Sequence, residues 1–171
     1  MVATQNIVLV GAMGVGKSTV GKRLAKKLSV EFYDSDQEIV KKTGVDIATI
    51  FEYEGEKGFR KREEKTIEEL CSIDNIVLAT GGGAILSAKT RELLSGSGTV
   101  FYLKASIETL LNRVKSENSR PLLNTSNKRK TISDLLDQRA PLYEAVAHYT
   151  INTDRHTVNW SADQILKKIQ N

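Results

Sequence analysis

The chain has 171 residues, of which 25 are Lys or Arg and 21 are Asp or Glu, so its formal net charge is +4. This length fits one compact domain and leaves little room for a second. The single cysteine, Cys71, excludes an internal disulfide, and with His148 and His156 it makes no recognisable zinc spacing. The surplus of positive charge is compatible with three kinds of partner: nucleic acid, a membrane surface or a small anionic ligand.

The first residues are not typical of a targeting signal. Residues 1–6 are uncharged and lead directly into the apolar run 7–10. They lack the charged start and the cleavage site of a secretory signal, and they lack the arginines of a transit peptide. No stretch approaches the roughly 18 apolar residues that a membrane span requires. We therefore expect a cytoplasmic protein with no membrane partner.

Short apolar runs alternate with amphipathic segments along the chain. The apolar runs predict five strands, at residues 7–10, 31–33, 76–79, 99–103 and 149–152. Three of these runs are almost unbroken, which is typical of strands that are covered on both faces in a parallel sheet. Alternation of strands with helices favours an α/β sandwich with right-handed crossovers.

Helical patterns lie between the strands. An apolar stripe at residues 20–28 predicts a helix after the first strand, and further helices are expected at 37–42 and after Ser106. The last helix is expected to begin with Ser161 as its N-cap, because Gln164 stands three residues later and completes a capping box. The polar stretch 115–130 interrupts this alternation. Loops of this length in compact domains often have a function of their own, so we interpret the stretch as a lid.

The strongest motif lies between the first strand and the first helix. Residues 11–18 read Gly-Ala-Met-Gly-Val-Gly-Lys-Ser and fit G-x-x-x-x-G-K-[ST]. The glycines allow successive backbone N–H groups to point at phosphate oxygens, and the helix N-terminus adds its positive dipole end. Lys17 is expected on the β- and γ-phosphates, and the Ser18 hydroxyl on Mg²⁺. The motif therefore predicts a nucleoside triphosphate with Mg²⁺.

Three classes of protein use such a loop: GTPase switches, ATPase motors and small-molecule kinases. A GTPase needs Asn-Lys-x-Asp to read guanine, whereas residues 127–130 read Asn-Lys-Arg-Lys and follow no strand. A motor ATPase usually has an apolar strand that ends in an acidic residue, whereas the strand 76–79 is followed by Thr80 and three glycines. The acidic partner of the metal is therefore expected elsewhere, and Asp34 is the best candidate.

Two carboxylates follow the second strand directly. Asp34 and Asp36 stand at its carboxyl end, the edge of an open α/β sheet where ligands bind. One carboxylate would reach Mg²⁺ through water while the other faces a substrate hydroxyl. The alternative is that an aspartate here simply caps the helix 37–42.

Glycines and arginines complete the candidate site. Gly81, Gly82 and Gly83 follow a buried strand, where they would let a ligand approach backbone N–H groups closely, although a glycine triplet is also a common loose turn. Each arginine by itself would be an ordinary solvated side chain or would pair with a glutamate one helical turn away. As a set they could bind carboxylate or phosphate bidentately. The arginines in question are Arg60, Arg62, Arg120 and Arg139.

Taken together, these motifs closely resemble the bacterial shikimate kinases across essentially the whole chain. The matching segments are residues 11–18, Asp34-Ser35-Asp36, Phe59-Arg60 with Glu63, residues 81–83, Arg120-Pro121-Leu122-Leu123 and residues 139–143. The resemblance implies a P-loop fold of the nucleoside-monophosphate-kinase type. This fold is a three-layer α/β/α sandwich with a five-stranded parallel sheet, a single domain over residues 1–171 and a mobile lid near 115–130. The implied reaction transfers the γ-phosphoryl group of ATP to the 3-hydroxyl of shikimate, on the route to chorismate and the aromatic amino acids.

The resemblance also implies roles for individual residues. The ATP phosphates would be bound by Gly14, Val15, Gly16, Lys17, Ser18 and Thr19. Arg113 would lie near the adenine, and Arg120 would move in with the lid. Ser18 would bind Mg²⁺, and Asp34 would hold a metal-bound water. In the adenine loop, some relatives carry an arginine where this chain has His156.

For the acceptor, the resemblance assigns Asp36 to the shikimate hydroxyls and to the role of base. Arg60 and Arg139 would bind the carboxylate, and the backbone of Gly81, Gly82 and Gly83 would line the ring. The catalytic set would be Lys17, Asp36 and Arg120. Family members are usually monomers, which makes a monomer the expectation here.

Two other functions remain as alternatives. One is another small-molecule kinase of the same fold, such as a gluconate or nucleotide kinase. The other is a nucleic-acid-binding module, suggested by the basic composition and by residues 128–130. Only 6% of the residues are aromatic and no nucleic-acid-binding motif is present, so we expect no nucleic acid partner. Two anionic substrates, ATP and shikimate, would account for the basic surplus.

Overall fold

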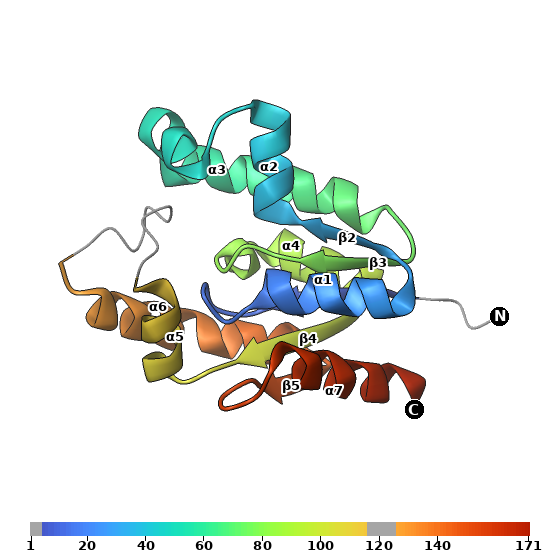
Figure 1. The fold of residues 1–171 in the computed structure, drawn as a ribbon. Helices are drawn as coiled ribbons and strands as arrows, with labels where there is room; N and C mark the ends of the chain where they lie inside the picture. The colour runs from blue at the N-terminus through green and yellow to red at the C-terminus, as the bar shows by residue number, and fades with distance from the viewer. Residues whose placement is uncertain (1–4, 116–125) are drawn as a thin grey trace.

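The computed structural model describes residues 5–115 and 126–171, and its strands form one parallel sheet with the order β2-β3-β1-β4-β5 (Figure 1). The strands are β1 Asn6–Val10, β2 Glu31–Asp34, β3 Ile76–Ala79, β4 Gly98–Lys104 and β5 Tyr149–Asn152. All five strands predicted from the apolar runs are confirmed. Three of them are longer than predicted, by one residue at one end in β1 and β2 and at both ends in β4.

Helices connect the strands and cover both faces of the sheet. They are α1 Lys17–Leu28, α2 Ser35–Thr43, α3 Ile47–Cys71, the short 3₁₀ helix η1 Ala84–Leu86, α4 Ala88–Ser97, α5 Ile107–Val114, α6 Lys128–Val146 and α7 Val158–Gln170. Helix α3 consists of two helical segments that meet at Gly55, where φ is 71° and ψ is 178°. A positive φ is accessible to glycine at little cost, which explains the residue at this junction. No helix in the described ranges is long and apolar enough to cross a membrane.

The alternation of side chains along β1 separates two hydrophobic layers. Ile7 and Leu9 pack into the core beneath α1, α5 and α7, whereas Val8 and Val10 pack into the core beneath α3, α4 and α6. Both layers are apolar because successive side chains of a strand point to opposite faces, and helices cover each face. The expected three-layer α/β/α sandwich is therefore confirmed.

Two boundaries differ from the predicted ones. Helix α7 begins one turn earlier than expected: Thr157 is its N-cap and accepts a hydrogen bond from the Trp160 N–H at 3.1 Å, so Ser161 lies buried inside the helix. The predicted capping box was wrong because the threonine offers the same capping oxygen one turn earlier. The predicted loop 115–130 ends before Lys128, where α6 begins with Asn127 as its N-cap. Most of that predicted lid, residues 116–125, lies outside the described residues.

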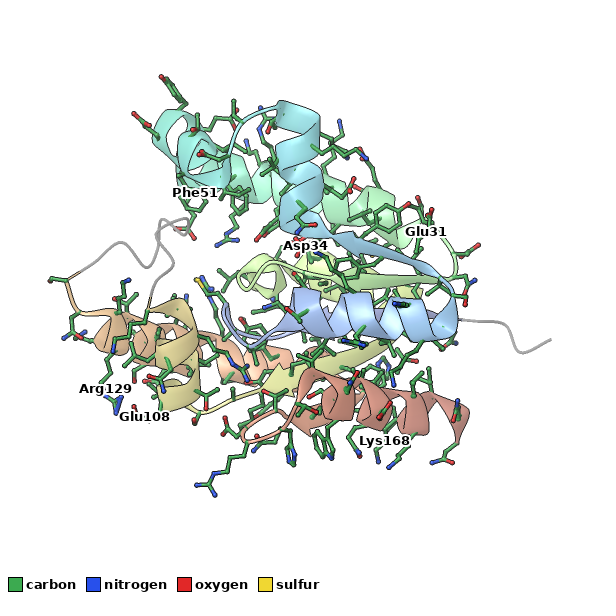
Figure 2. All side chains as sticks on the ribbon, viewed as in Figure 1. Glu31, Asp34, Phe51, Glu108, Arg129 and Lys168 are labelled. Atoms are coloured by element: carbon green, nitrogen blue, oxygen red, sulfur yellow. The ribbon has the colours of Figure 1, made fainter. Side chains whose placement is uncertain are left out.

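Ion pairing joins the helices on either side of that segment. The Arg129 guanidinium of α6 donates to the Glu108 carboxylate of α5 (Figure 2). The two side chains are exposed, and pairs of this kind contribute little to stability. The contact nevertheless places the start of α6 beside α5.

The sheet order brings three strand ends together. β2, β3 and β1 are neighbours, and Ala79 at the end of β3 lies opposite Leu9 of β1 on one side and Asp34 of β2 on the other. Because parallel strands end at the same edge, the three segments that follow them start side by side. These segments are the phosphate-binding motif, the acidic pair and the glycine triplet (Figure 1).

Candidate active site

The loop between β1 and α1 depends on its glycines. Gly11, Gly14 and Gly16 have φ values of 148°, 83° and 101°, which side-chain-bearing residues rarely adopt. A Cβ atom at Gly11 would lie 2.5 Å from the Leu103 carbonyl oxygen, and one at Gly14 would lie 2.6 Å from Val114 Cγ1. Gly16 caps α1 without any side-chain hydrogen bond, so the first N–H groups of the helix are not used by a capping side chain. This loop can accept an anion on its backbone.

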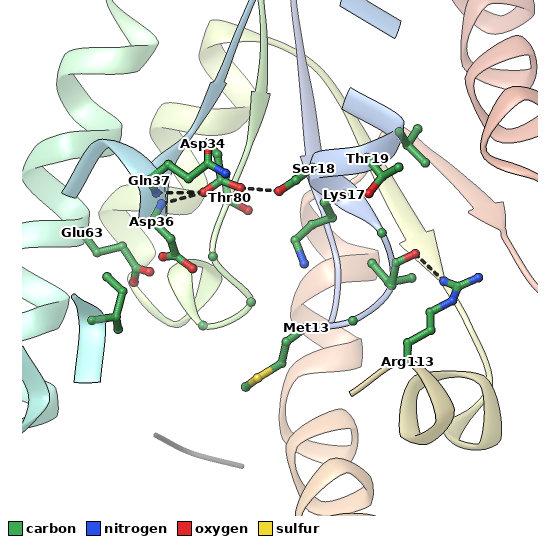
Figure 3. A pocket seen from close by; sticks show the side chains of 18 of the residues that line it. Met13, Lys17, Ser18, Thr19, Asp34, Asp36, Gln37, Glu63, Thr80 and Arg113 are labelled. Atoms are coloured by element: carbon green, nitrogen blue, oxygen red, sulfur yellow. Dashed lines mark hydrogen bonds between the residues drawn. The ribbon is translucent and has the colours of Figure 1, made fainter. Parts of the chain in front are cut away.

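Lys17 begins α1 and is almost completely buried. Its ammonium donates to the carbonyl oxygens of Gly11 and Ala12, at 2.7 and 2.9 Å. The charge is thus held inside the curve of the loop, where phosphate oxygens would be bound. Figure 3 shows that Lys17 approaches the pocket from α1 while Asp36 approaches it from α2 on the opposite side.

Arg113 of α5 supports the same loop. Its Nη1 donates to the Val15 carbonyl oxygen at 2.6 Å, across 98 residues of sequence (Figure 3). The arginine predicted near the adenine therefore also holds the backbone that would surround the phosphates.

Ser18 and Asp34 bring two oxygen donors together. The Ser18 hydroxyl donates to Asp34 Oδ2, while Asp34 Oδ1 accepts from the N–H groups of Asp36 and Gln37 at 2.9 and 3.1 Å (Figure 3). The capping alternative considered for the aspartates is therefore correct for Asp34, and α2 begins at Ser35 rather than at residue 37. One carboxylate oxygen caps the helix, and the other faces the hydroxyl that follows the phosphate-binding lysine.

This donor pair suits a hard cation. Hydroxyl and carboxylate oxygens are typical ligands of Mg²⁺, which usually keeps several waters and binds substrate phosphates in addition. Within the described residues, no group of three or more His, Cys, Asp or Glu side chains could hold a metal ion by itself. Ser18 and Asp34 therefore fit a cation that arrives with the nucleotide better than one that is bound permanently.

Two carboxylates lie side by side across the pocket from the loop. Asp36 extends from the first turn of α2 and Glu63 from α3, and the two carboxylates lie close to each other (Figure 3). A Cβ atom at Gly81 would lie 2.7 Å from Asp36 Oδ1 and 2.8 Å from Glu63 Oε2. Burial raises the pKa of Glu63 to about 7, although the nearby Arg60 guanidinium partly offsets this rise.

Arg60 lies against the third glycine. Its Nη1 donates to Glu63 Oε1 at 2.8 Å and its Nη2 to Glu56 Oε1 at 3.2 Å. A Cβ atom at Gly83 would lie only 2.3 Å from Arg60 Nη2. The predicted pairing of Arg60 with a glutamate one turn away is therefore present, and it orients the guanidinium beside the pocket.

Arg139 is buried, whereas most arginine side chains are exposed to solvent. Only 3% of this α6 residue is exposed, and its Nη1 lies 3.6 Å from where a Cβ atom of Gly82 would be. Arg62, in contrast, points away and forms an exposed bidentate pair with Glu54 at 2.6 and 2.8 Å. Arg62 therefore has no place in the site.

A single cavity of about 710 Å³ connects these groups. It runs from the acceptor side, with Asp36, Arg60 and Arg139, past the phosphate loop to His156 and Thr157. The predicted site residues within the described ranges all line it: Gly14, Val15, Gly16, Lys17, Ser18, Thr19, Asp34, Asp36, Arg60, Gly81, Gly82, Gly83, Arg113 and Arg139. The cavity thus offers one binding region for a nucleotide and another for a small acceptor with negative charge.

Comparison with known proteins identifies the family. The family model "Shikimate kinase" matches residues 13–170. The chain is 50% identical to a shikimate kinase of Thioalkalivibrio sulfidiphilus over 96% of this chain and 87% of the relative, and 49% identical to one of Vibrio campbellii over 99% of both. The chain belongs to the shikimate kinase family.

Solved structures agree with this assignment. A shikimate kinase of Acinetobacter baumannii in complex with shikimate superposes with a TM-score of 0.95 at 50% identity, covering 97% of this chain and 93% of that one. A shikimate kinase of Aquifex aeolicus gives a TM-score of 0.83 at 32% identity and covers 96% of both chains. The expected P-loop kinase fold and the expected class of enzyme, an ATP-dependent kinase, are both confirmed.

Glu63 is the residue of the site whose environment the sequence did not reveal. It was noted only as part of the shikimate kinase pattern, although its spacing of three residues from Arg60 was a signal that both side chains share a helix face. Arg120, which was expected to act from the lid, lies outside the described residues.

Proposed function

We propose that this protein transfers the γ-phosphoryl group of ATP to the 3-hydroxyl of shikimate in the cavity described above. The proposal rests mainly on the observation that one cavity is lined by two groups of residues with different chemistry. Lys17 and the glycine loop form the half for phosphate, and Asp36 with two arginines forms the half for a hydroxylated carboxylate. Membership of the shikimate kinase family supports this choice of acceptor over gluconate or a nucleotide.

On the nucleotide side, the backbone N–H groups from Gly14 to Thr19 would bind the phosphates. Lys17 would exchange its two carbonyl partners for β- and γ-phosphate oxygens, and Arg120 would add a second positive charge from the lid. Positioning and neutralisation of charge provide most of the catalysis in phosphoryl transfer, so these groups act without forming a covalent intermediate.

Ser18 and Asp34 would hold Mg²⁺ that enters with ATP, Asp34 through a water molecule. When bound, the ion neutralises charge on the β- and γ-phosphate oxygens. Because Asp34 Oδ1 also caps α2, the helix fixes the orientation of this carboxylate.

On the acceptor side, Arg60 and Arg139 would bind the shikimate carboxylate, and the backbone of residues 81–83 would line the ring. Asp36 would accept the proton of the shikimate 3-hydroxyl while the oxygen of that hydroxyl forms a bond to the γ-phosphorus of ATP. The bond from that phosphorus to the oxygen it shares with the β-phosphate breaks at the same stage, and ADP leaves. Glu63 would orient Arg60 through the hydrogen bond at 2.8 Å.

The base of the nucleotide would lie at the other end of the cavity. Arg113 and His156 line this end, and the His156 ring stacks on Trp160 with centroids 3.5 Å apart. A histidine that is already stacked offers a flat surface for adenine in place of the arginine found in some relatives.

We further propose that residues 1–171 form one kinase domain, with a lid that spans about 115–127. The protein would act as a monomer in the cytoplasm, where ATP is available. No nucleic acid or membrane is needed as a partner for this reaction.

The decisive experiment measures ADP release with shikimate as the sole acceptor, using a coupled assay in the presence of Mg²⁺. Gluconate and nucleoside monophosphates serve as matched alternative acceptors. We expect release that depends on shikimate only. Equal or greater release with another acceptor would contradict the proposal.

A further inference from the structure

A tyrosine that does not line the cavity is hydrogen-bonded to the glycine loop 81–83, which does. The hydroxyl of Tyr143, on α6, donates a hydrogen bond of 2.5 Å to the Gly82 carbonyl oxygen. Residues 82 and 143 are 61 positions apart in the sequence. The bond therefore joins the glycine loop to α6, and both pack against the same face of the sheet. Tyr143 does not line the cavity, which means that it can act only through neighbours that do.

The ring of Tyr143 has little freedom to move. The residue is 1% exposed and packs in the core with Val10, Leu78 and Val146. It also stacks on Tyr102, with ring centroids 5.1 Å apart and an angle of 28° between the planes. Burial raises the pKa of the Tyr143 hydroxyl above its ordinary value, so the group stays protonated and remains a donor at neutral pH.

The same tyrosine is close to Arg139. The two residues stand four positions apart on α6, which places them on one face of the helix. The charge of the Arg139 guanidinium acts on the nearby Tyr143 hydroxyl, and its Nη1 lies 3.6 Å from where a Cβ atom of Gly82 would be. Gly82, Tyr143 and Arg139 thus form one contiguous polar group, of which only the glycine and the arginine reach the cavity.

We propose that Tyr143 is a positioning residue that fixes the Gly81–Gly83 loop relative to Arg139. Its bond to the Gly82 carbonyl sets the direction of the adjacent peptide groups. Because Arg139 stands one helical turn before Tyr143 on α6, the same bond also sets the position of the loop relative to the Arg139 guanidinium. The inference rests on the proposed function, in which both elements contact shikimate, but the anchoring itself is a property of the unliganded protein.

The test uses Tyr143→Phe, with Tyr102→Phe as a matched control. Both changes remove one hydroxyl from the same pair of stacked and buried rings. In the described part of the chain, Tyr102 has no hydrogen bond to the glycine loop. We expect Tyr143→Phe to raise KM for shikimate roughly tenfold while KM for ATP stays within about twofold, since removal of a buried donor leaves the Gly82 carbonyl without this partner. Tyr102→Phe should leave both constants near those of the unchanged protein.

A second measurement needs neither substrate nor activity. Amide resonances of Gly81, Gly82 and Gly83 in ¹⁵N-labelled, unliganded protein should shift in Tyr143→Phe and stay in place in Tyr102→Phe. Unchanged glycine resonances, or an equal change of both KM values, would overturn the positioning role. If the unchanged protein does not phosphorylate shikimate, the proposed function fails, whereas shifted resonances would still support the anchoring.

Discussion

Each glycine of the 81–83 triplet lies close to a different neighbour. A side chain at Gly81 would meet the carboxylates of Asp36 and Glu63, and one at Gly83 would meet the Arg60 guanidinium. Gly82 lies closest to the phosphate loop, where a Cβ atom would be 3.3 Å from the Met13 nitrogen. The triplet is therefore not a loose turn, because its missing side chains leave the space that the functional groups occupy.

Gly83→Ala should impair acceptor binding without unfolding the protein. The new methyl group would collide with the end of a flexible arginine side chain at 2.3 Å, so Arg60 would move while the backbone stays. We expect KM for shikimate to rise by about tenfold or more, the scale for a lost charge-assisted hydrogen bond, with KM for ATP nearly unchanged. Steady-state kinetics with each substrate varied will measure this.

Gly96→Ala is the matched control, because nothing lies within 4 Å of a Cβ atom at that helical position. Its kinetic constants should equal those of the unchanged protein. A normal KM for shikimate in Gly83→Ala would contradict the role of Arg60.

Glu63 should make the stability of the protein depend on pH. Its pKa is raised from 4.5 to about 7 in the folded state, chiefly by burial. A carboxyl group with a raised pKa favours folding at low pH, and this contribution is lost as pH rises from about 4.5 through 7. The folded protein should therefore lose stability from this group between pH 5 and pH 8, on the order of 2 kcal/mol.

Glu63→Gln removes the titrating group and keeps the side-chain shape. Urea unfolding of both proteins at pH 5 and pH 8 measures the difference in the free energy of unfolding. We expect the unchanged protein to lose about 2 kcal/mol relative to the variant over this interval. Parallel pH profiles would show that Glu63 does not titrate in this range.

At the scale of elements, the end of the phosphate loop is hydrogen-bonded to the start of α2. Ser18 at the N-terminus of α1 donates to Asp34 at the N-terminus of α2, and the strands that precede these helices are separated in the sheet only by β3. Arg113 of α5 holds the loop from the other side at 2.6 Å. Three helices thus orient one short loop, which limits how far it can move when a nucleotide binds.

Lys17→Met should lower kcat about 100-fold or more, since one preorganised positive group is lost where charge develops. The side chain is almost completely buried within the loop, so solvent or another lysine would not replace it easily. Lys22→Met provides the control, because Lys22 is an exposed residue on the same helix. Activity near that of the control would exclude the assigned role of Lys17.

At the scale of the whole molecule, one cavity would serve both substrates in the proposed function. Its described lining carries four basic side chains, Lys17, Arg60, Arg113 and Arg139, and four acidic ones, Asp34, Asp36, Asp46 and Glu63. The described lining is therefore balanced in formal charge, and the basic surplus of the chain lies outside it. In the proposed function, anion binding would therefore depend on the positions of the arginines more than on the net charge of the described lining.

A shared cavity predicts direct transfer between two bound substrates. Initial rates measured over a grid of ATP and shikimate concentrations should give intersecting double-reciprocal lines, and the protein should not exchange label between ADP and ATP when shikimate is absent. Both outcomes follow if ATP and acceptor bind in the one cavity of about 710 Å³. Parallel lines together with exchange would indicate a phosphorylated enzyme instead.

Local and periodic features were predictable from the sequence alone. Five strands were located to within one residue at each end, because unbroken apolar runs leave few alternatives in a sheet covered on both faces. The phosphate loop was equally clear, since its glycines and its Lys-Ser pair act through neighbouring positions. Helix starts were less certain: Thr157 and Ser161 both offer a capping oxygen, and only the packed helix selects Thr157.

The sequence by itself determined the family, the order of the elements and which strand ends line the candidate site. Only the tertiary structure decided the state of the groups between those ends: the buried carboxyl of Glu63, the enclosed Arg139 and the bond from Tyr143 to Gly82. The physical reason is that burial and orientation depend on partners from distant elements. Gly82 and Tyr143 are 61 positions apart, and no pattern in either segment specifies the other.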